Sequence, residues 1–169
     1  LGYTHCSIED IGILRSIPSI TIISPADSLE TVKAIEASIT HENSCYIRLT
    51  GSANNPIVYN KDYNFEIGKS VKLKKGKDIS IICSGAIVSE CLKASEILEK
   101  KGISCEVVNM HTIKPVDKQA VIEASKKKLI VTVEEHNILG GLGSAVAESK
   151  AQIKNSPKQI FIGVNDIYD

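Results

Sequence analysis

The chain has 169 residues, of which 43% are hydrophobic, and its twenty basic side chains balance twenty acidic ones. This length and apolar content suffice for a globular protein of one ordinary domain or two small ones. The formal net charge of zero lacks the basic excess that is typical of nucleic-acid and anionic-membrane binders, so we expect neither partner.

No stretch approaches the roughly 18 apolar residues of a membrane span, and the five cysteines form no C-x-x-C pair. Three of these cysteines lie in apolar runs, where a thiol behaves as a small hydrophobic group. We therefore predict a reduced, cytoplasmic protein. Because the chain opens on Leu1 and reaches a turn almost at once, we expect it to be cut from something larger.

The first part of the chain predicts one β-α-β unit. Ser7 and Asp10 resemble a capping box before a short helix. A β-branched run at 20–23 predicts a buried strand, apolar spacing predicts a helix over 27–39, and another strand follows at 45–49. The two strands should therefore be parallel. Two strands are too few to bury both faces of a parallel sheet, so we expect further strands upstream.

Residues 50–65 are rich in turn formers and lack a sustained period, which predicts an interdomain linker with a boundary near residue 60. Beyond it, a strand at 69–74 is predicted to turn back antiparallel onto a strand at 79–84. The elements expected next are a helix at 88–100 that Gly102 ends, a strand at 105–110, a helix at 117–127, a strand at 129–133, a helix at 143–154 and a strand at 160–164.

The predicted fold class is therefore α/β, in two parts. Residues 1–60 form a partial parallel α/β unit. Residues 61–169 form a three-layer αβα domain with a five-stranded, mostly parallel sheet that has one antiparallel strand. We expect the last strand to lack a covering helix.

Parallel α/β sheets bind ligands beyond the carboxyl ends of their strands, and two such places carry suitable side chains. Thr4 and His5 precede the first helix, where a neutral imidazole can donate to a substrate oxygen or move a proton. Arg48 ends a strand, where its guanidinium can hold a phosphate or carboxylate through two hydrogen bonds. The alternatives are an exposed loop histidine and a salt-bridged or snorkelling arginine.

A third place is the glycine-rich run at 134–144. Gly141 and Gly143 precede a helix, and Asp166 follows about twenty residues later, as in a dinucleotide-binding fingerprint. However, Val146 stands at the third glycine position, and 134–139 separates the glycines from the strand. We therefore favour close packing of the helix through its glycines and keep dinucleotide binding as the alternative.

Other catalytic and metal signatures are missing from the sequence. There is no zinc-ligand spacing, no G-x-S-x-G and no phosphate loop with G-K-[ST], so no metal site is predicted. His111 is interpreted as a loop histidine.

Several segments in register resemble the transketolase family of thiamine-diphosphate enzymes. The main ones are 2–10 with 15–18 (GYTHCSIED and RSIP), 23–27 (ISPAD) and 132–136 with 140–148 (TVEEH and GGLGSAVAE). Shorter segments at 46–49 and 113–117 add to them, so the resemblance covers nearly the whole chain.

The resemblance implies that 1–60 is the C-terminal half of a pyrimidine-binding domain and that 61–169 is a transketolase C-terminal domain without its last helix. The implied reaction transfers a two-carbon ketol unit from a ketose phosphate to an aldose phosphate, as in the pentose phosphate pathway. His5 would be catalytic, Thr4 and His5 would bind the sugar, and Arg48 would bind its phosphate.

The resemblance also implies thiamine diphosphate and a divalent metal in the intact enzyme. The activating glutamate is expected upstream of residue 1, and another domain holds the diphosphate. We therefore expect this fragment to bind no cofactor and to be inactive alone. The expected assembly is a homodimer or a heteromer with the diphosphate-binding half.

Alternatives within the architecture are a deoxyxylulose-phosphate synthase and the β subunit of a 2-oxo-acid dehydrogenase, although the segment at 7–10 favours the transketolase branch. An alternative of another class is a non-catalytic dimerisation or assembly module.

Overall fold

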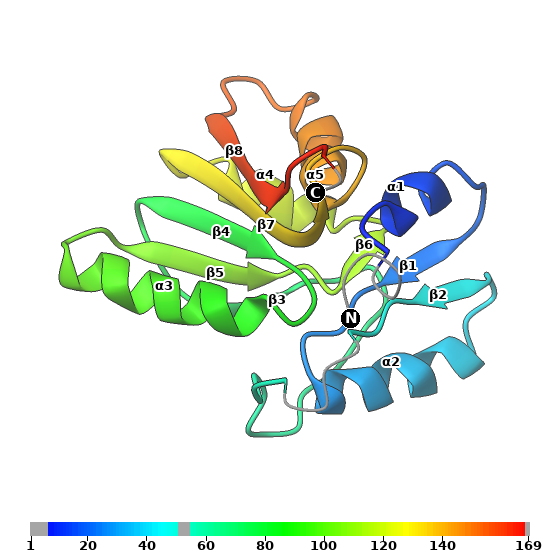
Figure 1. The fold of residues 1–169 in the computed structure, drawn as a ribbon. Helices are drawn as coiled ribbons and strands as arrows, with labels where there is room; N and C mark the ends of the chain where they lie inside the picture. The colour runs from blue at the N-terminus through cyan, green and yellow to red at the C-terminus, as the bar shows by residue number, and fades with distance from the viewer. Residues whose placement is uncertain (1–6, 51–54, 168–169) are drawn as a thin grey trace.

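The computed structural model describes residues 7–50 and 55–167, and these form two sheets (Figure 1). The three-stranded sheet has the order β2 (Cys45–Ile47), β1 (Thr21–Ile23), β6 (Thr112–Lys114). The five-stranded sheet has the order β3 (Val71–Lys74), β5 (Cys105–Asn109), β4 (Ile79–Cys83), β7 (Leu129–Asn137), β8 (Lys158–Val164).

The predicted β-α-β unit is present at the start of the described chain. Strands β1 and β2 are parallel and are connected through α2 (Ser28–Ile39). The carboxylate of Asp27 caps this helix by accepting a hydrogen bond from the backbone N–H of Glu30 at 2.9 Å. The preceding short helix, α1 (Asp10–Leu14), has no side-chain cap. The capping box predicted from Ser7 and Asp10 is therefore wrong, because Asp10 contacts a different partner, described below.

The first sheet gains its third strand from the second half of the chain. Strand β6 pairs antiparallel with β1, so a segment beyond residue 110 completes a sheet that begins at residue 21. The sequence pattern did not predict β6, because three residues are too few to show a period.

The prediction of a five-stranded, mostly parallel sheet with one antiparallel strand is confirmed. The antiparallel strand is β3, but its partner is β5 and not β4, so the hairpin predicted between 69–74 and 79–84 is wrong. Four of the five residues of β4 are buried, and both edges of β4 are occupied by parallel neighbours. The alternating β3 is left at the edge of the sheet.

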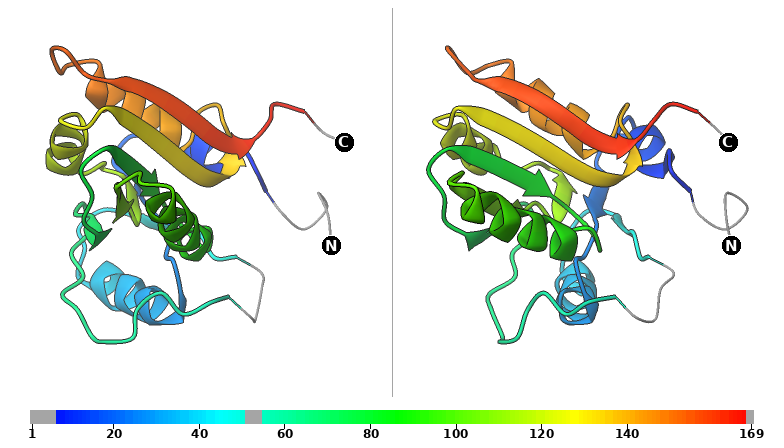
Figure 2. Two further views of the ribbon diagram at one scale, coloured as in Figure 1. Left: turned by 90° about the vertical axis from the view of Figure 1, so that its left-hand side faces the viewer. Right: turned by 60° about the vertical axis from the view of Figure 1, so that its left-hand side comes forward.

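Helices cover the five-stranded sheet on both faces (Figure 2). One face packs against α3 (Val88–Lys100), which ends as predicted at Gly102 with a φ of +79°. The other face packs against α4 (Lys118–Ala124) and α5 (Leu142–Lys150), both shorter than predicted. This gives the predicted three layers.

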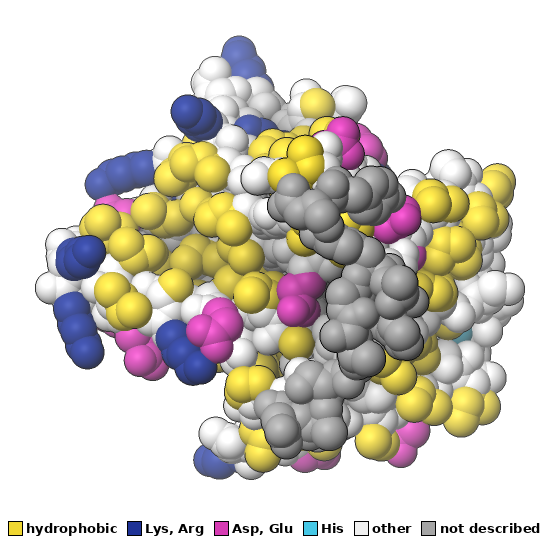
Figure 3. Space-filling view, viewed as in Figure 1, with side chains coloured by type: hydrophobic (Ala, Val, Ile, Leu, Met, Phe, Trp, Pro, Cys, Tyr) yellow, Lys and Arg dark blue, Asp and Glu magenta, His cyan; other side chains and the backbone are white. Residues whose placement is uncertain are grey.

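The face of the five-stranded sheet that packs against α3 is exposed at its β8 edge. Ile160 and Ile162 on β8 pair in register with Val131 and Val133, and they are 40% and 51% exposed. Hydrophobic side chains gather on this face (Figure 3). The boundary expected near residue 60 and the expected missing last helix stay predictions. Within the described residues, no helix is long and apolar enough to cross a membrane.

Candidate functional site

The structure places one of the three predicted site residues. Thr4 and His5 lie outside the described residues. Arg48 directly follows β2, at the carboxyl ends of the parallel strands β1 and β2, as the sequence predicts.

Arg48 joins three segments that are distant in sequence. Its Nη2 donates to the backbone carbonyls of Ser7 at 2.8 Å and Glu135 at 2.9 Å, and its Nε donates to Oδ2 of Asp10 at 2.9 Å. The side chain is only 12% exposed. Because Ser7 lies two residues after His5 in the sequence, Arg48 is bound to the same segment that carries the predicted histidine. Arg48 is therefore salt-bridged, as the alternative interpretation has it. It also lies at the strand end where the sequence predicts a ligand clamp.

Asp10 is a residue of this site that the sequence reasoning missed. Its Oδ2 accepts from Arg48 and also from Oη of Tyr46 at 2.8 Å, and its side chain is 10% exposed. Tyr46 and Arg48 are two residues apart along β2 and its continuation, so their side chains emerge on the same face. Burial raises the pKa of Tyr46, and the hydrogen bond to Asp10 adds to the rise. This alternation of polar residues at the end of β2 is the signal that could have indicated a partner on α1.

The glycine-rich run contains a buried carboxylate. Strand β7 continues to Asn137, so the end predicted for this strand at residue 133 is wrong. Glu134 is 5% exposed and accepts hydrogen bonds from the backbone N–H groups of Leu142 at 2.6 Å and Gly143 at 2.8 Å. Burial raises the pKa of Glu134, while these two hydrogen bonds lower it. The amides at the start of α5 that a dinucleotide phosphate would need are thus occupied by Glu134.

His136 fixes α1 to the five-stranded sheet. It is fully buried, and its Nε2 accepts from the backbone N–H of Gly12 at 3.2 Å. Its Nδ1 lies 2.7 Å from the carbonyl oxygen of Asn137, so the neutral tautomer with the proton on Nδ1 satisfies both contacts. Directly after α1, the side chain of Arg15 donates to the carbonyl of Gly140 at 2.8 Å. The helix that follows the segment of His5 is therefore attached to β7 and the loop after it.

His111 is a loop histidine, as the sequence suggested, but it is buried. It is 1% exposed, and its ring stacks on Phe65 with 4.2 Å between the ring centroids. It lies between β5 and β6, where the chain crosses from one sheet to the other. Burial lowers the pKa of His111 to about 4.

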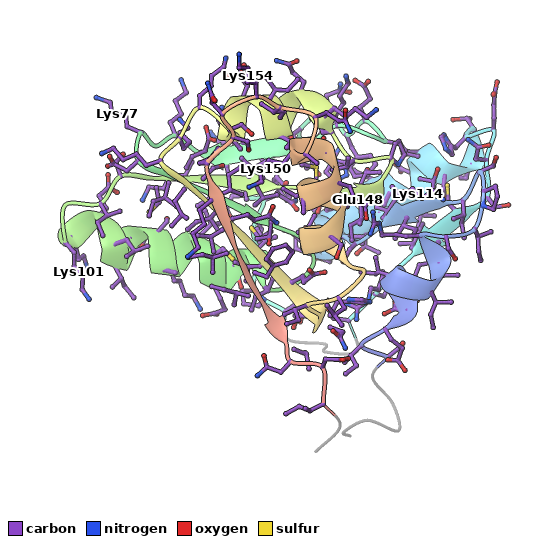
Figure 4. The ribbon with its side chains drawn as sticks, turned by 90° about the horizontal axis from the view of Figure 1, so that it is seen from above. Lys77, Lys101, Lys114, Glu148, Lys150 and Lys154 are labelled. Carbon is purple, nitrogen blue, oxygen red and sulfur yellow. The ribbon has the colours of Figure 1, made fainter. Side chains whose placement is uncertain are left out.

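A separate groove of about 610 Å³ lies among α1, β6, α4 and α5. Its floor is largely apolar, and two of its cations are held by the protein itself. Lys114 donates to the carbonyl of Arg15 at 2.9 Å, and Arg15 pairs with Glu148. Lys114 and Glu148 are labelled in Figure 4. Lys118, the third cation of the lining, has no ion-pair or hydrogen-bond partner among the described residues, so it is the one free charge that these residues offer an anionic ligand in the groove.

The described residues do not fit the diphosphate or the metal of a thiamine cofactor. In 7–50 and 55–167, no group of three or more histidine, cysteine or acidic side chains could hold a metal ion. The glycine-rich start of α5 is occupied by Glu134.

Two protein-family models match the chain. Residues 1–55 match the transketolase pyrimidine binding domain, and residues 68–162 match the transketolase C-terminal domain.

Curated relatives agree with these families. A putative transketolase C-terminal section of Methanocaldococcus jannaschii is 40% identical over 168 residues, which cover 99% of this chain and 52% of the relative. A 6-deoxy-6-sulfo-D-fructose transketolase subunit of Clostridium sp. is 38% identical over 169 residues, with 99% and 52% covered. Human transketolase is 34% identical over 152 residues, with 88% and 24% covered. The chain thus spans about half the length of the first two relatives.

Solved structures agree as well. One described as a split gene transketolase in an inactive beta4 tetramer matches with a TM-score of 0.92 and 36% identity, covering 98% of this chain and 55% of that one. A transketolase mutant from Pichia stipitis matches with a TM-score of 0.65 and 25% identity, covering 95% and 23%. The chain therefore belongs to the transketolase family, with residues 1–55 matching its pyrimidine binding domain and residues 68–162 its C-terminal domain.

Proposed function

We propose that this chain is the C-terminal portion of a thiamine-diphosphate-dependent transketolase, which transfers a two-carbon ketol unit from a ketose phosphate to an aldose phosphate. The observation that carries the proposal is the position of Arg48, a guanidinium at the carboxyl end of β2 that is bound to the backbone of Ser7, close in sequence to His5. A planar guanidinium is well suited to a phosphate tail.

The proposed roles divide binding from proton transfer. Arg48 holds the phosphate and thereby aligns the reacting carbon, because Nη1 makes no hydrogen bond to the described residues and can donate to a ligand. Thr4 and His5 bind the sugar oxygens, and His5 stabilises the developing alkoxide or moves its proton. The cofactor, when bound by the rest of the enzyme, supplies the electron sink.

The proposed assembly is a homodimer or a heteromer with a diphosphate-binding half, in the cytoplasm. One observation supports a divided enzyme: several relatives of the chain are described as subunits or sections. We expect the chain alone to be inactive and to take part in ketol transfer only within the complete enzyme, which adds the segment expected upstream of residue 1, the diphosphate-binding half, thiamine diphosphate and a divalent metal. Activity of the isolated chain would contradict this.

Arg48→Ala in the complete enzyme is expected to raise the KM for a phosphorylated ketose about 10- to 100-fold, because a charge-assisted clamp is lost. The KM for the unphosphorylated ketose should change much less. The measurement is the ratio of kcat/KM for the two donors. This ratio does not depend on how much of the variant is folded, which matters because Asp10 loses one of its two donors and keeps only Tyr46. An unchanged ratio would refute the clamp.

His5→Ala is expected to lower kcat about 100-fold on both donors, because a general acid or base is removed. Its ratio of kcat/KM for phosphorylated and unphosphorylated donors should stay close to that of the unmodified enzyme. Steady-state kinetics with both donors check this. A loss confined to the phosphorylated donor would assign His5 to phosphate binding instead.

A further inference from the structure

A buried negative charge lies directly behind the proposed phosphate clamp. The carboxylate of Asp10 is 10% exposed, and its Oδ2 lies 2.9 Å from Nε of Arg48. Its Oδ1 is buried and has no hydrogen-bond partner among the described residues. The carboxylate is thus only partly compensated by its donors, Arg48 and Tyr46.

The orientation of Arg48 does not depend on this carboxylate alone. Nη2 is already held by two backbone carbonyls, those of Ser7 and Glu135, on separate segments of the chain. An uncharged residue of the same shape as Asp10 would keep an acceptor for Nε. The feature that Asp10 adds and that an amide would not is therefore its charge.

The charge opposes the binding of anions in proportion to their own charge. Coulomb repulsion between Asp10 and a ligand one guanidinium away grows with ligand charge in a partly buried site. A phosphate monoester has a second pKa of about 6 and is mostly doubly charged at neutral pH. A sulfonate carries one negative charge, and a hydroxyl carries none.

We propose that Asp10 is a specificity-determining residue that acts through Arg48, as an internal counter-charge that weakens the preference of the site for a doubly charged phosphate tail over singly charged or uncharged tails. This inference rests on the proposed function of Arg48. It assigns to Asp10 a role that is opposite to that of an orienting residue, since removal of its charge should tighten phosphate binding.

The test is Asp10→Asn in the complete enzyme loaded with cofactor. We expect the ratio of kcat/KM for a phosphorylated over an unphosphorylated ketose to rise about tenfold, mainly through KM of the phosphorylated donor. The inhibition constant of inorganic phosphate against the unphosphorylated donor should fall by a similar factor. Asp62→Asn is the matched control, because it makes the same charge change on an exposed side chain paired with Lys33.

The possible outcomes separate this inference from the proposed function. If Arg48→Ala lowers the ratio while Asp10→Asn leaves it unchanged or lowers it, Asp10 is no counter-charge and the clamp stands. If neither variant changes the ratio, the clamp itself fails, and this inference with it. In the double variant the ratio should equal that of Arg48→Ala alone. A tenfold rise that persists without Arg48 would overturn the claim that Asp10 acts through it.

Discussion

Replacing Gly141 with alanine is expected to lower the free energy of unfolding of this chain by about 3 kcal/mol. A Cβ atom at this position would lie 2.0 Å from Oε2 of Glu134 and 2.7 Å from Nδ1 of His136. Both side chains are buried, so neither can swing into solvent. Relief of the clash would require Glu134 to withdraw from the backbone N–H groups of Leu142 and Gly143, which would leave buried polar groups unpaired.

Gly102→Ala is the control for this substitution. Gly102 has a φ of +79°, and no atom lies within 4 Å of the position that an added Cβ would occupy, so only backbone strain of about 1 kcal/mol is expected. Gly141 has a φ of −84°, so it does not have the left-handed backbone of Gly102. Urea unfolding followed by circular dichroism compares the two variants. A loss at Gly141 no larger than at Gly102 would show that Glu134 relaxes freely and that the close contact is unimportant.

The glycine-rich run shows how far the sequence could be interpreted. Close packing was the favoured interpretation, and the contacts of Gly141 with Glu134 and of Gly143 with Phe161 agree with it. The extension of β7 was not predicted, because Glu134 and His136 turn polar side chains toward the interior. An apolar pattern cannot indicate a strand whose buried positions are a carboxylate and an imidazole.

The α/β order, the helices and the parallel strands could be predicted because each depends on local periodicity and on short connections. The partner of β3 and the existence of β6 could not be predicted from the sequence, because the edges of several strands compete for the same short strand. Arg48 was found from its residue type and its place at a strand end. Asp10 was missed because the alternation of Tyr46 and Arg48 indicates a polar partner but does not identify one 38 positions away, whereas a capping box at Ser7 gives Asp10 a local role.

Acidification is expected to destabilise the fold through His111. In the unfolded chain this imidazole binds a proton below pH 6.5, its ordinary pKa. In the folded chain burial lowers its pKa to about 4, with the charge of Asp117 opposing this shift. Between these values the unfolded state binds more protons, so the stability is complete above pH 6.5 and is lost as the pH falls toward 4. The expected loss is about 3 kcal/mol, because one pKa unit corresponds to about 1.4 kcal/mol.

Two buried carboxylates have the opposite effect on stability as the pH falls, and the experiment must separate their effect from that of His111. Burial raises the pKa values of Glu30 and Glu134, so the folded state takes up their protons first as the pH falls. His111→Phe keeps an aromatic ring against Phe65 and removes the imidazole, while the carboxylates stay. Urea unfolding of both proteins is measured from pH 7.5 to pH 4. Over this range the free energy of unfolding of the unmodified protein should fall by about 3 kcal/mol relative to that of the variant. If the free energies of unfolding of the two proteins change in parallel with pH, His111 accepts a proton in the folded state as easily as an exposed histidine does.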